Sequence, residues 1–552
     1  MEISRPARLP SATETVKPQR LHLNLHRSLV IIVITLALAL RLYGIDFGFP
    51  YLYDQDENDF VEPALQMLAN RDPNPGYFQH PASTTIYMLA ATYAGIFGLG
   101  YLTGIYDSPQ AFADQLYQDP TVVYLAGRLE IVLFGTASVL LVYLIGRRVL
   151  NPTFGLLAAL LTAVAPLHIW ISQLIRTDVM TGFFALAAFW FCLNILDQGR
   201  WRDYLLAGVF TALAIMTKYP AVVFALTIVV AHGLTVTQWR NIRQHSKLVG
   251  SGIATVLAAF ITSPFLFLDF QETLRDVTFE MRGEHLSATG EGFLPNLLWY
   301  IGHPLLDNLT LIGLGLVVLG IGAGWFSRDR RKLILTVFPI AFLLFISILS
   351  LRQERWPVPI LPFMTLLAAA GAAWLWSWLR LRLTTRSRII VMSLLVLLVT
   401  VPLSYMALGQ ALAVDGPRAR TIAREWMLEN IPAGSRILMA LYAPQLPERH
   451  YEFFYVDLGG DILQFDPDVG PGVTYRPAGN HAFLADTSQV EANDVEYIVT
   501  EWLYERYMLE PERYPDEIAT LERLTALGDL VFEVYPPPLQ PNSFPIRIYR
   551  VR

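Results

Sequence analysis

The apolar run SLVIIVITLALALRLY (residues 28–43) is followed shortly by the acidic segment YDQDENDF (residues 53–60). The first segment approaches the ~20 apolar residues that a membrane-spanning helix needs. The second segment places four carboxylates within six residues, just outside the hydrocarbon. Such a cluster binds cations, activates a hydroxyl group or simply solvates a membrane edge, and the rest of the sequence must distinguish these roles.

The composition of the chain is that of an integral membrane protein. Of its 552 residues, 54% are hydrophobic and only 16% are charged, whereas soluble domains carry roughly 25% charged residues. The net charge of −6 and the lack of a basic tract with interleaved aromatic residues argue against nucleic acid as a partner. The single cysteine, Cys192, lies in an apolar run and excludes an intramolecular disulfide framework or a cysteine-based metal site.

Residues 1–27 form a basic segment before the first apolar run. No small-residue cleavage site follows that run before Phe47-Gly48-Phe49-Pro50, as it would after a signal peptide. We therefore predict a cytoplasmic N-terminal tail and a retained first helix that runs from inside to outside. The compact loops favour the plasma membrane of a prokaryote as the location of this multi-pass protein.

Further spans are predicted from apolar runs bounded by charge or proline. They are residues 128–146, 154–171, 179–196, 204–217, 219–236, 248–268, 306–326, 333–351, 357–379 and 389–412. Clusters of arginine and lysine recur at every second loop, which is the pattern of cytoplasmic loops. Together with the first helix, the sequence predicts a polytopic α-helical membrane protein of about eleven spans.

The apolar stretch from Thr84 to Leu102 breaks this alternation if it spans the membrane. Its glycines and the polar connection that follows suit a helix that lies in the outer interface or re-enters it. We therefore predict that this stretch is external, and a twelfth span is the alternative.

The alternation places three regions on the outer face: the loops 44–125 and 269–305, and a tail of residues 413–552. Residues 28–412 then form one multi-span domain. The tail has a helical pattern over Arg418–Glu429 and four short strand patterns, which predict a small extracytoplasmic α/β domain. The strands are predicted at residues 437–441, 495–500, 530–535 and 546–551.

Two candidate functional positions lie in the first external loop. Asp56 and Glu57 open a predicted short helix, and because the helix dipole favours carboxylates in a first turn, capping and solvation are the alternative to catalysis. His80 precedes Pro81 and is therefore locally extended. It is interpreted either as a hydrogen-bonding or proton-carrying group or as a packed interfacial histidine.

Further polar residues lie at the predicted outer ends of later spans, where charge is costly and usually functional. Asp178, after Arg176, either orients a substrate or metal ion or belongs to a turn staple. Lys218 is either a phosphate contact or a snorkelling lysine. Arg352 and Arg355 depart from the positive-inside trend and are interpreted as a phosphate clamp, because arginine is the natural bidentate partner of phosphate.

The external loop 269–305 contains Arg282, Glu284 and His285 beside two glycines. Its predicted position suits a flexible lid that grips donor or acceptor. A solvated connector is the alternative.

Several of these segments together resemble the GT-C class of membrane glycosyltransferases. They are Asp56-Glu57, His80-Pro81, Arg128, Asp178, Thr217-Lys218-Tyr219 and Arg355-Trp356. The resemblance covers residues 28–412 and is to the branch that contains dolichyl-phosphate-mannose protein O-mannosyltransferases and bacterial aminoarabinose lipid A transferases. Ala82 stands where that branch often has a second proline.

The resemblance implies that a sugar is transferred from a polyprenyl-phosphate donor to an acceptor hydroxyl on the outer face of the membrane. It implies that Asp56 is the general base and that Glu57 orients it or binds the acceptor. A divalent metal ion shared by Asp56 and Asp178 is a further alternative, because members of the branch differ in metal use. The residues interpreted as substrate-binding are His80, Arg128, Asp178, Lys218, His285, Arg352 and Arg355.

Two other classes of function remain open from the sequence. A secondary transporter or lipid flippase would also be polytopic, although such proteins tend to carry polar groups near the membrane midplane and internal repeats. A non-catalytic assembly protein would use the tail for docking. For a transferase, the acceptor is equally a lipid, a glycan or a protein, and the sugar is not specified by these residues.

Overall fold

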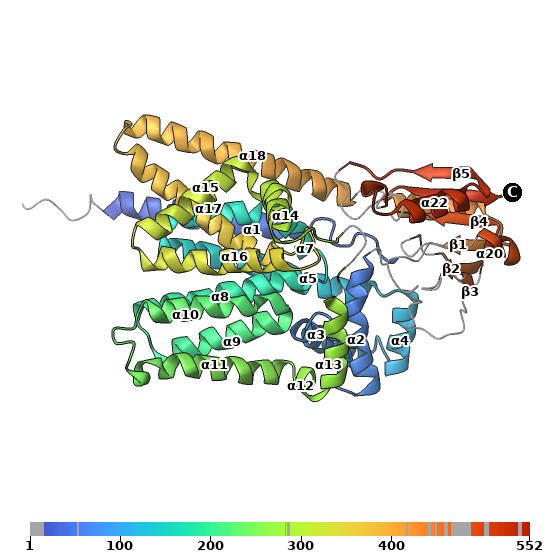
Figure 1. The fold of residues 1–552 in the computed structure, drawn as a ribbon, viewed down its shortest axis with the longest axis horizontal. Helices are drawn as coiled ribbons and strands as arrows, with labels where there is room; N and C mark the ends of the chain where they lie inside the picture. The colour runs from blue at the N-terminus through green and yellow to red at the C-terminus, as the bar shows by residue number, and fades with distance from the viewer. Residues whose placement is uncertain are drawn as a thin grey trace, which may run out of the picture.

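Figure 1 shows a bundle of long helices and, beyond one end of it, a small β-sheet covered by short helices. This computed structural model describes residues 16–51, 54–281, 283, 288–415, 418–439, 443–444, 446–447, 450–456, 462–464, 487–501, 507–538 and 544–552. The bundle helices are α1 (Val16–Leu42), α5 (Thr121–Val149), α6 (Pro152–Ala163), α7 (Pro166–Ser172), α8 (Thr177–Asp197), α9 (Trp201–Thr217), α10 (Ala225–Gly233), α11 (Ile242–Thr262), α15 (Leu306–Phe326), α16 (Arg330–Ile348), α17 (Leu361–Leu379) and α18 (Thr385–Asp415).

Shorter elements gather at the end of the bundle next to the sheet or join bundle helices. They are η1 (Gln55–Glu57), α2 (Asn58–Asn70), α3 (Ser83–Leu102), α4 (Pro109–Gln118), η2 (Tyr219–Phe224), α12 (Phe265–Leu268), α13 (Phe270–Glu280), α14 (Phe293–Tyr300), the π-helical η3 (Ile301–Leu305) and η4 (Val358–Ile360).

The predicted polytopic α-helical fold is confirmed. In the part of the chain that the structure describes, nine helices are long and apolar enough to cross a membrane, or ten if α6 and α7 form one bent span. Each of the eleven predicted spans coincides with a bundle helix or a consecutive pair. Two predicted spans lie outside the count of ten. They are α9, which has 17 residues, and Tyr219–Gly233, which is a shorter apolar helical segment.

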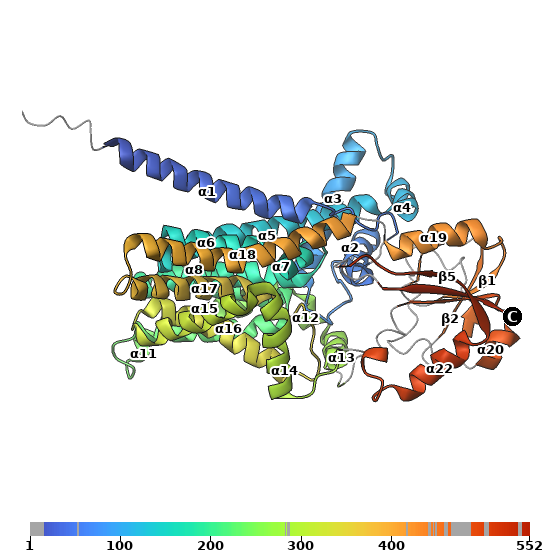
Figure 2. The same cartoon turned by 90° about the horizontal axis from the view of Figure 1, so that it is seen from above.

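Helix α3 is the element whose membrane position the sequence left open. Its length and composition suit a span. However, it runs across the long axis of the bundle, at the end where α2 and α4 lie (Figures 1 and 2). This direction agrees with the predicted external or interfacial position of Thr84–Leu102.

Helices α15 and α17 pack with their backbones close together. Helix α17 is buried over most of its length. A Cβ atom at Gly320 would lie 2.0 Å from the carbonyl oxygen of Leu367, and one at Gly371 would lie 2.0 Å from that of Leu316. Small residues permit such contacts between helices in a membrane, where packing rather than hydrophobic burial drives association. Larger residues at either glycine would separate the two helices.

The C-terminal part contains a six-stranded sheet in the order β3-β2-β1-β4-β6-β5 among the described residues. Strand β1 pairs in parallel with β2 and β4, and the other neighbours are antiparallel. The four predicted strands are present, whereas β2 and β3 were not predicted. The strands are β1 (Arg436–Met439), β2 (Glu452–Val456), β3 (Ile462–Gln464), β4 (Tyr497–Thr500), β5 (Gly528–Val534) and β6 (Ile546–Val551).

Helices cover both faces of this sheet (Figure 2). Ile437 and Met439 of β1 pack toward α19 (Ala419–Asn430), whereas Leu438 packs with buried residues of α20 (Thr487–Ala492) and α22 (Pro515–Thr525). This alternation follows from the two-residue period of a strand. The expected small α/β domain is therefore a three-layer unit.

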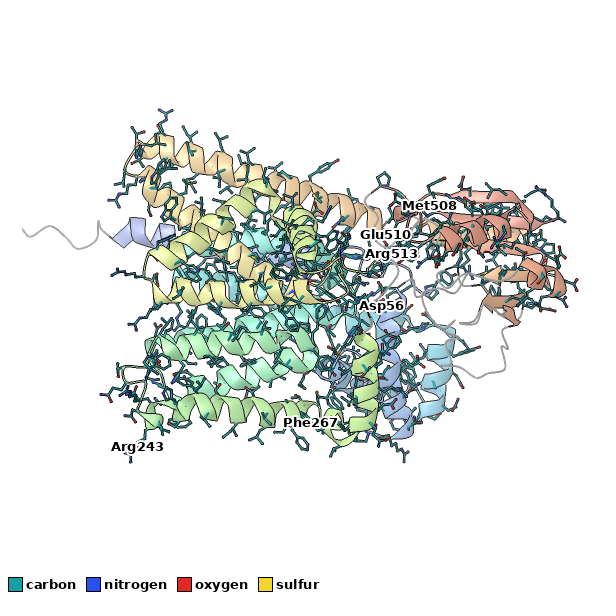
Figure 3. All side chains as sticks on the ribbon, viewed as in Figure 1. Asp56, Arg243, Phe267, Met508, Glu510 and Arg513 are labelled. Carbon is teal, nitrogen blue, oxygen red and sulfur yellow. The ribbon has the colours of Figure 1, made fainter. Side chains whose placement is uncertain are left out.

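Two arginines at the start of the C-terminal part contact the segment that precedes Asp56. The Arg418 guanidinium lies 4.3 Å from the centre of the Phe47 ring, and that of Arg424 lies 4.1 Å from the Tyr51 ring. Figure 3 shows Asp56 at the end of the bundle next to the sheet, and Arg243, in a basic connection, at the opposite end. The acidic cluster and the basic loops therefore lie at opposite ends of the bundle, as the predicted alternation requires.

The described part of the loop 269–305 is largely helical and contacts the first external loop. Most of it forms α13 and α14, and α13 is tied to the first loop because Asp276 Oδ2 accepts the Phe78 N–H at 2.8 Å. A second tie joins Asn74 Nδ2 and Asp269 Oδ2 at 3.0 Å. The two regions predicted to be external are thus packed on one another.

Candidate active site

Asp56 lies between two arginines that come from distant parts of the chain. Its Oδ2 atom contacts Nη1 of Arg176, which immediately precedes α8, and Nη1 of Arg355, between α16 and η4, at 3.0 Å. Arg176 also binds Oδ1 of Asp54 at 2.7 Å. The Asp54 side chain is 3% exposed, whereas that of Asp56 is 41% exposed. Asp56 is therefore the carboxylate of this network that a ligand can reach.

The two arginines set the ionisation of Asp56. Burial opposes the charged form, but the charges and hydrogen bonds of Arg176 and Arg355 outweigh it and hold the pKa of Asp56 well below its usual range. In this arrangement Asp56 is thus ionised but weakly basic. Any ligand that draws Arg355 away raises the affinity of Asp56 for a proton.

A second charged group borders the first. The Lys218 ammonium, between α9 and η2, pairs with Oδ1 of Asp178 in the first turn of α8, and both side chains are buried. His80 lies within electrostatic range of Lys218, Asp178, Asp56 and Arg355. Burial, together with the charges of Arg355 and Lys218, lowers the pKa of His80 to about 3, so its ring is neutral at physiological pH. The structure thus brings five of the predicted site residues into one cluster.

Glu57 and Arg128 form a fully buried ion pair beneath this cluster. Arg128 Nε and Nη2 bind the two carboxylate oxygens of Glu57 at 2.9 and 2.6 Å, and both side chains are 0% exposed. The Ile175 N–H also donates to Glu57, at 2.9 Å. Arg128 Nη1 in turn donates to the carbonyl oxygens of Ile45 and Phe47 at 2.8 and 2.9 Å.

These contacts correct two sequence-based roles. Arg128 was expected to bind substrate, but its guanidinium is enclosed by Glu57, two carbonyl groups and the Phe47 and Phe49 rings. Glu57 cannot contact an acceptor for the same reason, because its carboxylate is fully buried. Of its two predicted roles, orientation of Asp56 is the one that this geometry allows.

Arg41, in α1, stabilises the same region from the membrane side. It is 0% exposed and has no acidic partner among its hydrogen-bonded contacts in the described chain. Its guanidinium donates to the carbonyl oxygens of Thr162 and Ala163 at 3.4 and 3.3 Å, and contacts Nδ1 of His168 at 2.9 Å. These carbonyls end α6, where helical partners are missing and a cation complements the helix dipole. Arg41 thereby holds the 62° bend between α6 and α7, and α7 leads directly to Arg176.

Replacement of Arg41 by methionine is expected to lower thermal stability and weaken donor binding together. The change leaves buried carbonyl groups unpaired, at about 1–3 kcal/mol each, and frees α7 to shift Arg176. Thermal unfolding and donor-binding titration of purified protein measure the two effects. Ile32→Met, at a 59% exposed position of α1, is the control. Unchanged stability and affinity in the Arg41 variant would show that the bend does not need this side chain.

One predicted site residue, Arg352, does not join the cluster. Arg352 turns toward the 288–292 segment, where its Nη2 binds Glu291 Oε1 at 2.9 Å and its guanidinium lies 5.2 Å from the Trp299 ring. The arginine that meets Arg355 at Asp56 is therefore Arg176, and Arg352 is directed elsewhere. His285 lies outside the described residues.

The site does not fit the divalent metal ion that the sequence left as an alternative. Among the described residues, no group of three or more histidine, cysteine, aspartate or glutamate side chains is arranged to hold one. Asp56 and Asp178 are instead each paired with protein cations. A metal ion between them would be repelled by Arg176, Arg355 and Lys218. The arrangement favours an anionic ligand.

The sequence did not identify Arg41 and Arg176 as site or scaffold residues. For Arg41 a signal existed, because a charge inside an apolar run is rarely incidental. Arg176 was noted only as a neighbour of Asp178. Its pairing with Asp54 and Asp56 joins positions about 120 residues apart, and spacing along the chain carries no signal for such a contact.

The chain is similar to one family model and to several solved structures. Residues 121–267 match the family model described as dolichyl-phosphate-mannose-protein mannosyltransferase. No curated protein matched the chain in the sequence comparison. Among solved structures, ArnT from Cupriavidus metallidurans in the apo state is 16% identical, with a TM-score of 0.53, over 94% of this chain and 97% of that chain.

A second solved structure is the archaeal oligosaccharyltransferase AglB from Archaeoglobus fulgidus, in complex with an inhibitory peptide and a dolichol-phosphate. It is 12% identical, with a TM-score of 0.52, over 96% of this chain and 74% of that chain. ArnT bound to undecaprenyl phosphate also matches, at 16% identity and a TM-score of 0.50, over the same shares as the apo form. The chain therefore has the fold of the GT-C class of membrane glycosyltransferases.

Proposed function

We propose that the protein transfers a sugar from a polyprenyl-phosphate donor to an acceptor hydroxyl at the end of the bundle next to the sheet. The observation that carries this proposal is the partly exposed Asp56 held between Arg176 and Arg355. A carboxylate and two phosphate-binding side chains at one accessible point are what this reaction requires. The ligands named for ArnT and AglB, undecaprenyl phosphate and dolichol-phosphate, support the same class of donor.

When the donor binds, Arg355 exchanges its partner Asp56 for the donor phosphate. Three cations, Arg176, Arg355 and Lys218, already balance three carboxylates, Asp54, Asp56 and Asp178. A phosphate group can therefore bind only if one of these cations leaves its carboxylate partner. Arg355 is that cation, because its partner Asp56 is the exposed carboxylate and keeps Arg176 as a second partner. Lys218 lies within electrostatic range of the same groups, and its positive charge stabilises the phosphate.

The exchange couples donor binding to base strength. Once Arg355 turns to the phosphate, the pKa of Asp56 rises toward its ordinary value. Asp56 then takes the proton of the acceptor hydroxyl as that oxygen attacks the anomeric carbon. The bond from the anomeric carbon to the phosphate oxygen breaks, its electron pair leaves with polyprenyl phosphate, and Arg355 stabilises the added charge. Neutral His80 supplies a hydrogen-bonding wall without adding charge.

The topology of the proposed enzyme follows from the basic loops. We place residues 1–27 and the basic end of the bundle in the cytoplasm, and the site with residues 413–552 outside the plasma membrane. Residues 28–412 are the transferase domain, with external loops 44–125 and 269–305. Lipids, glycans and proteins remain the candidate acceptor classes, since each presents a hydroxyl to the same base.

The proposal is tested by incubating purified, membrane-reconstituted protein with a panel of sugar-labelled polyprenyl phosphates and cell-envelope extract. Covalently bound label in lipid, glycan or protein fractions is expected for one donor. Mass spectrometry of envelope glycans and glycolipids from cells with and without the gene identifies the natural product. If every donor is recovered intact with active extract present, glycosyl transfer is refuted.

The pH dependence of kcat/KM for the donor tests the Asp56–Arg355 contact. The pKa values of Asp56 and His80 in the free enzyme both lie below the ordinary range, so the rate should show no acidic limb between pH 5 and 8. In Arg355→Gln one of the two depressing charges is lost while Arg176 remains, so the pKa of Asp56 rises and the acidic limb should move up in pH. Arg355→Lys keeps the charge and serves as the control. Identical profiles for all three proteins would contradict the contact.

A further inference from the structure

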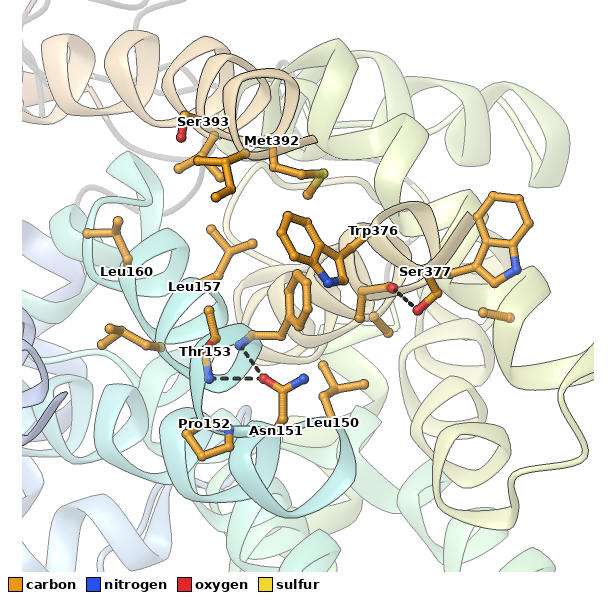
Figure 4. A pocket seen from close by; sticks show the side chains of 18 of the residues that line it. Leu150, Asn151, Pro152, Thr153, Leu157, Leu160, Trp376, Ser377, Met392 and Ser393 are labelled. Carbon is orange, nitrogen blue, oxygen red and sulfur yellow. Dashed lines mark hydrogen bonds between the residues drawn. The ribbon is translucent and has the colours of Figure 1, made fainter. Parts of the chain in front are cut away.

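A cavity of about 1020 Å³ lies among α6, α15, α16, α17 and α18, far from the Asp56 cluster. It exceeds the ~300–1,000 Å³ typical of ligand pockets. Figure 4 shows Met392 and Ser393 of α18 facing Leu157 and Leu160 of α6 across it, with Trp376 of α17 as a further wall. The cavity opens between helices that meet lipid, because α18 lies at the edge of the bundle (Figure 1).

The polarity of the cavity changes with depth. We call the part of the cavity at the basic end of the bundle, where α6 begins and α17 ends, its mouth. The lining there includes the polar residues Asn151, Thr153, Ser327, Lys332 and Ser377. Its deeper part is lined mainly by apolar residues, among them Leu160, Ala370, Val396 and Leu397. A polar mouth at the membrane surface above an apolar interior matches a lipid with its head group at the mouth.

The positively charged side chains near the mouth indicate which kind of lipid head group would bind there. The Arg388 guanidinium lies 4.0 Å from the centre of the Trp376 ring, and its Nε–H is buried without a hydrogen-bond partner among the described residues. Among the described residues, the Lys332 ammonium has one ion pair, a long contact to Asp329 Oδ2 at 3.5 Å. Asp329 is itself engaged by the Arg331 N–H at 3.1 Å. Lys332 lines the cavity, and Arg388 stacks on the lining residue Trp376 and directly precedes the lining residue Ile389. Two cations therefore lie at this end of the cavity, as a phosphate head group requires.

We propose that this cavity binds an anionic phospholipid of the leaflet on the basic side, with an acyl chain between α6 and α18 and the phosphate between Lys332 and Arg388. Basic pockets between membrane helices on the cytoplasmic side recognise anionic head groups in this way. The site is independent of the transfer reaction, because it lies at the opposite end of the bundle from Asp56. The lipid fills a gap between α18 and the rest of the bundle and fixes α18 in place.

The test uses quenching of tryptophan fluorescence by phospholipids with brominated acyl chains, with the full-length protein in detergent micelles. Brominated phosphatidylglycerol is expected to quench at lower concentration than brominated phosphatidylcholine. Lys332→Gln and Arg388→Gln should each weaken the apparent affinity for phosphatidylglycerol about fivefold, with no change for phosphatidylcholine. Trp376→Phe keeps a ring at the cavity wall and should remove much of the quenched signal.

The matched control is Arg243→Gln, which removes one positive charge at the same end of the bundle but at a far corner from the cavity (Figures 1 and 3). Its lipid preference should equal that of the unaltered protein. Equal quenching by both lipids in the unaltered protein would overturn the proposal. So would a preference that survives in both charge variants, or one that Arg243→Gln reduces as much as they do.

Discussion

Asp56→Asn is expected to lower the rate of sugar transfer by about 10²–10⁴-fold, the usual contribution of a general base. Asparagine keeps the size of the side chain and an oxygen that accepts from Arg176, so the fold should persist. It also releases the charge that holds Arg355, and we therefore expect donor binding to be equal or tighter. Single-turnover transfer and donor titration measure the two quantities separately.

Asp59→Asn is the matched control for that substitution. It removes a carboxylate from the same acidic segment, in the first turn of α2, outside the Arg176–Asp56–Arg355 network. A change of about twofold or less is expected for such a position. If Asp59→Asn abolishes transfer and Asp56→Asn does not, the base has been assigned to the wrong carboxylate.

Glu57→Gln and Arg128→Met are expected to have the largest effects on stability. Each leaves the opposite charge buried and unpaired, which costs about 3–5 kcal/mol. Both variants should unfold at markedly lower temperature. Combining them removes both charges, so the double variant should regain part of the loss, which a double-mutant cycle of thermal unfolding measures.

Asp197→Asn supplies the comparison for this pair. Asp197 pairs with Arg148 and Arg331 at 2.7 Å each, but its side chain is 25% exposed and the pairs lie at the other end of the bundle. Exposed pairs contribute about 0–1 kcal/mol, so this variant should lose little stability. Equal losses from Asp197→Asn and Glu57→Gln would mean that burial of the Glu57–Arg128 pair has no special importance.

The helices were predictable because the membrane imposes a simple rule on the sequence. A span needs a long apolar run, and the basic loops give its direction. The bend between α6 and α7 was missed, because residues 154–171 form one apolar run and the break at Pro166 depends on Arg41 from another helix. Strand β3 was missed because its three residues carry little periodic signal. Strand β2 has five residues and contains aromatic residues that favour strands, so a signal for it existed.

The candidate site was predictable only as a set of charged positions at the ends of spans. Their partners depend on tertiary packing, which separates residues that look equivalent in sequence. Arg352 and Arg355 are three positions apart, yet one turns to Glu291 and the other to Asp56. Asp56 and Glu57 are adjacent, yet one is partly exposed and the other is fully buried beneath it.

The measurement that tests the central claim most directly follows a donor labelled in both the sugar and the polyprenyl chain, using sealed proteoliposomes and an acceptor extract. We expect sugar label to appear on the acceptor in a one-to-one ratio with free polyprenyl phosphate, and Asp56→Asn to form both products about 10²–10⁴-fold more slowly while still binding donor. Donor that crosses the bilayer with both labels still joined would instead identify a lipid transporter and contradict the account.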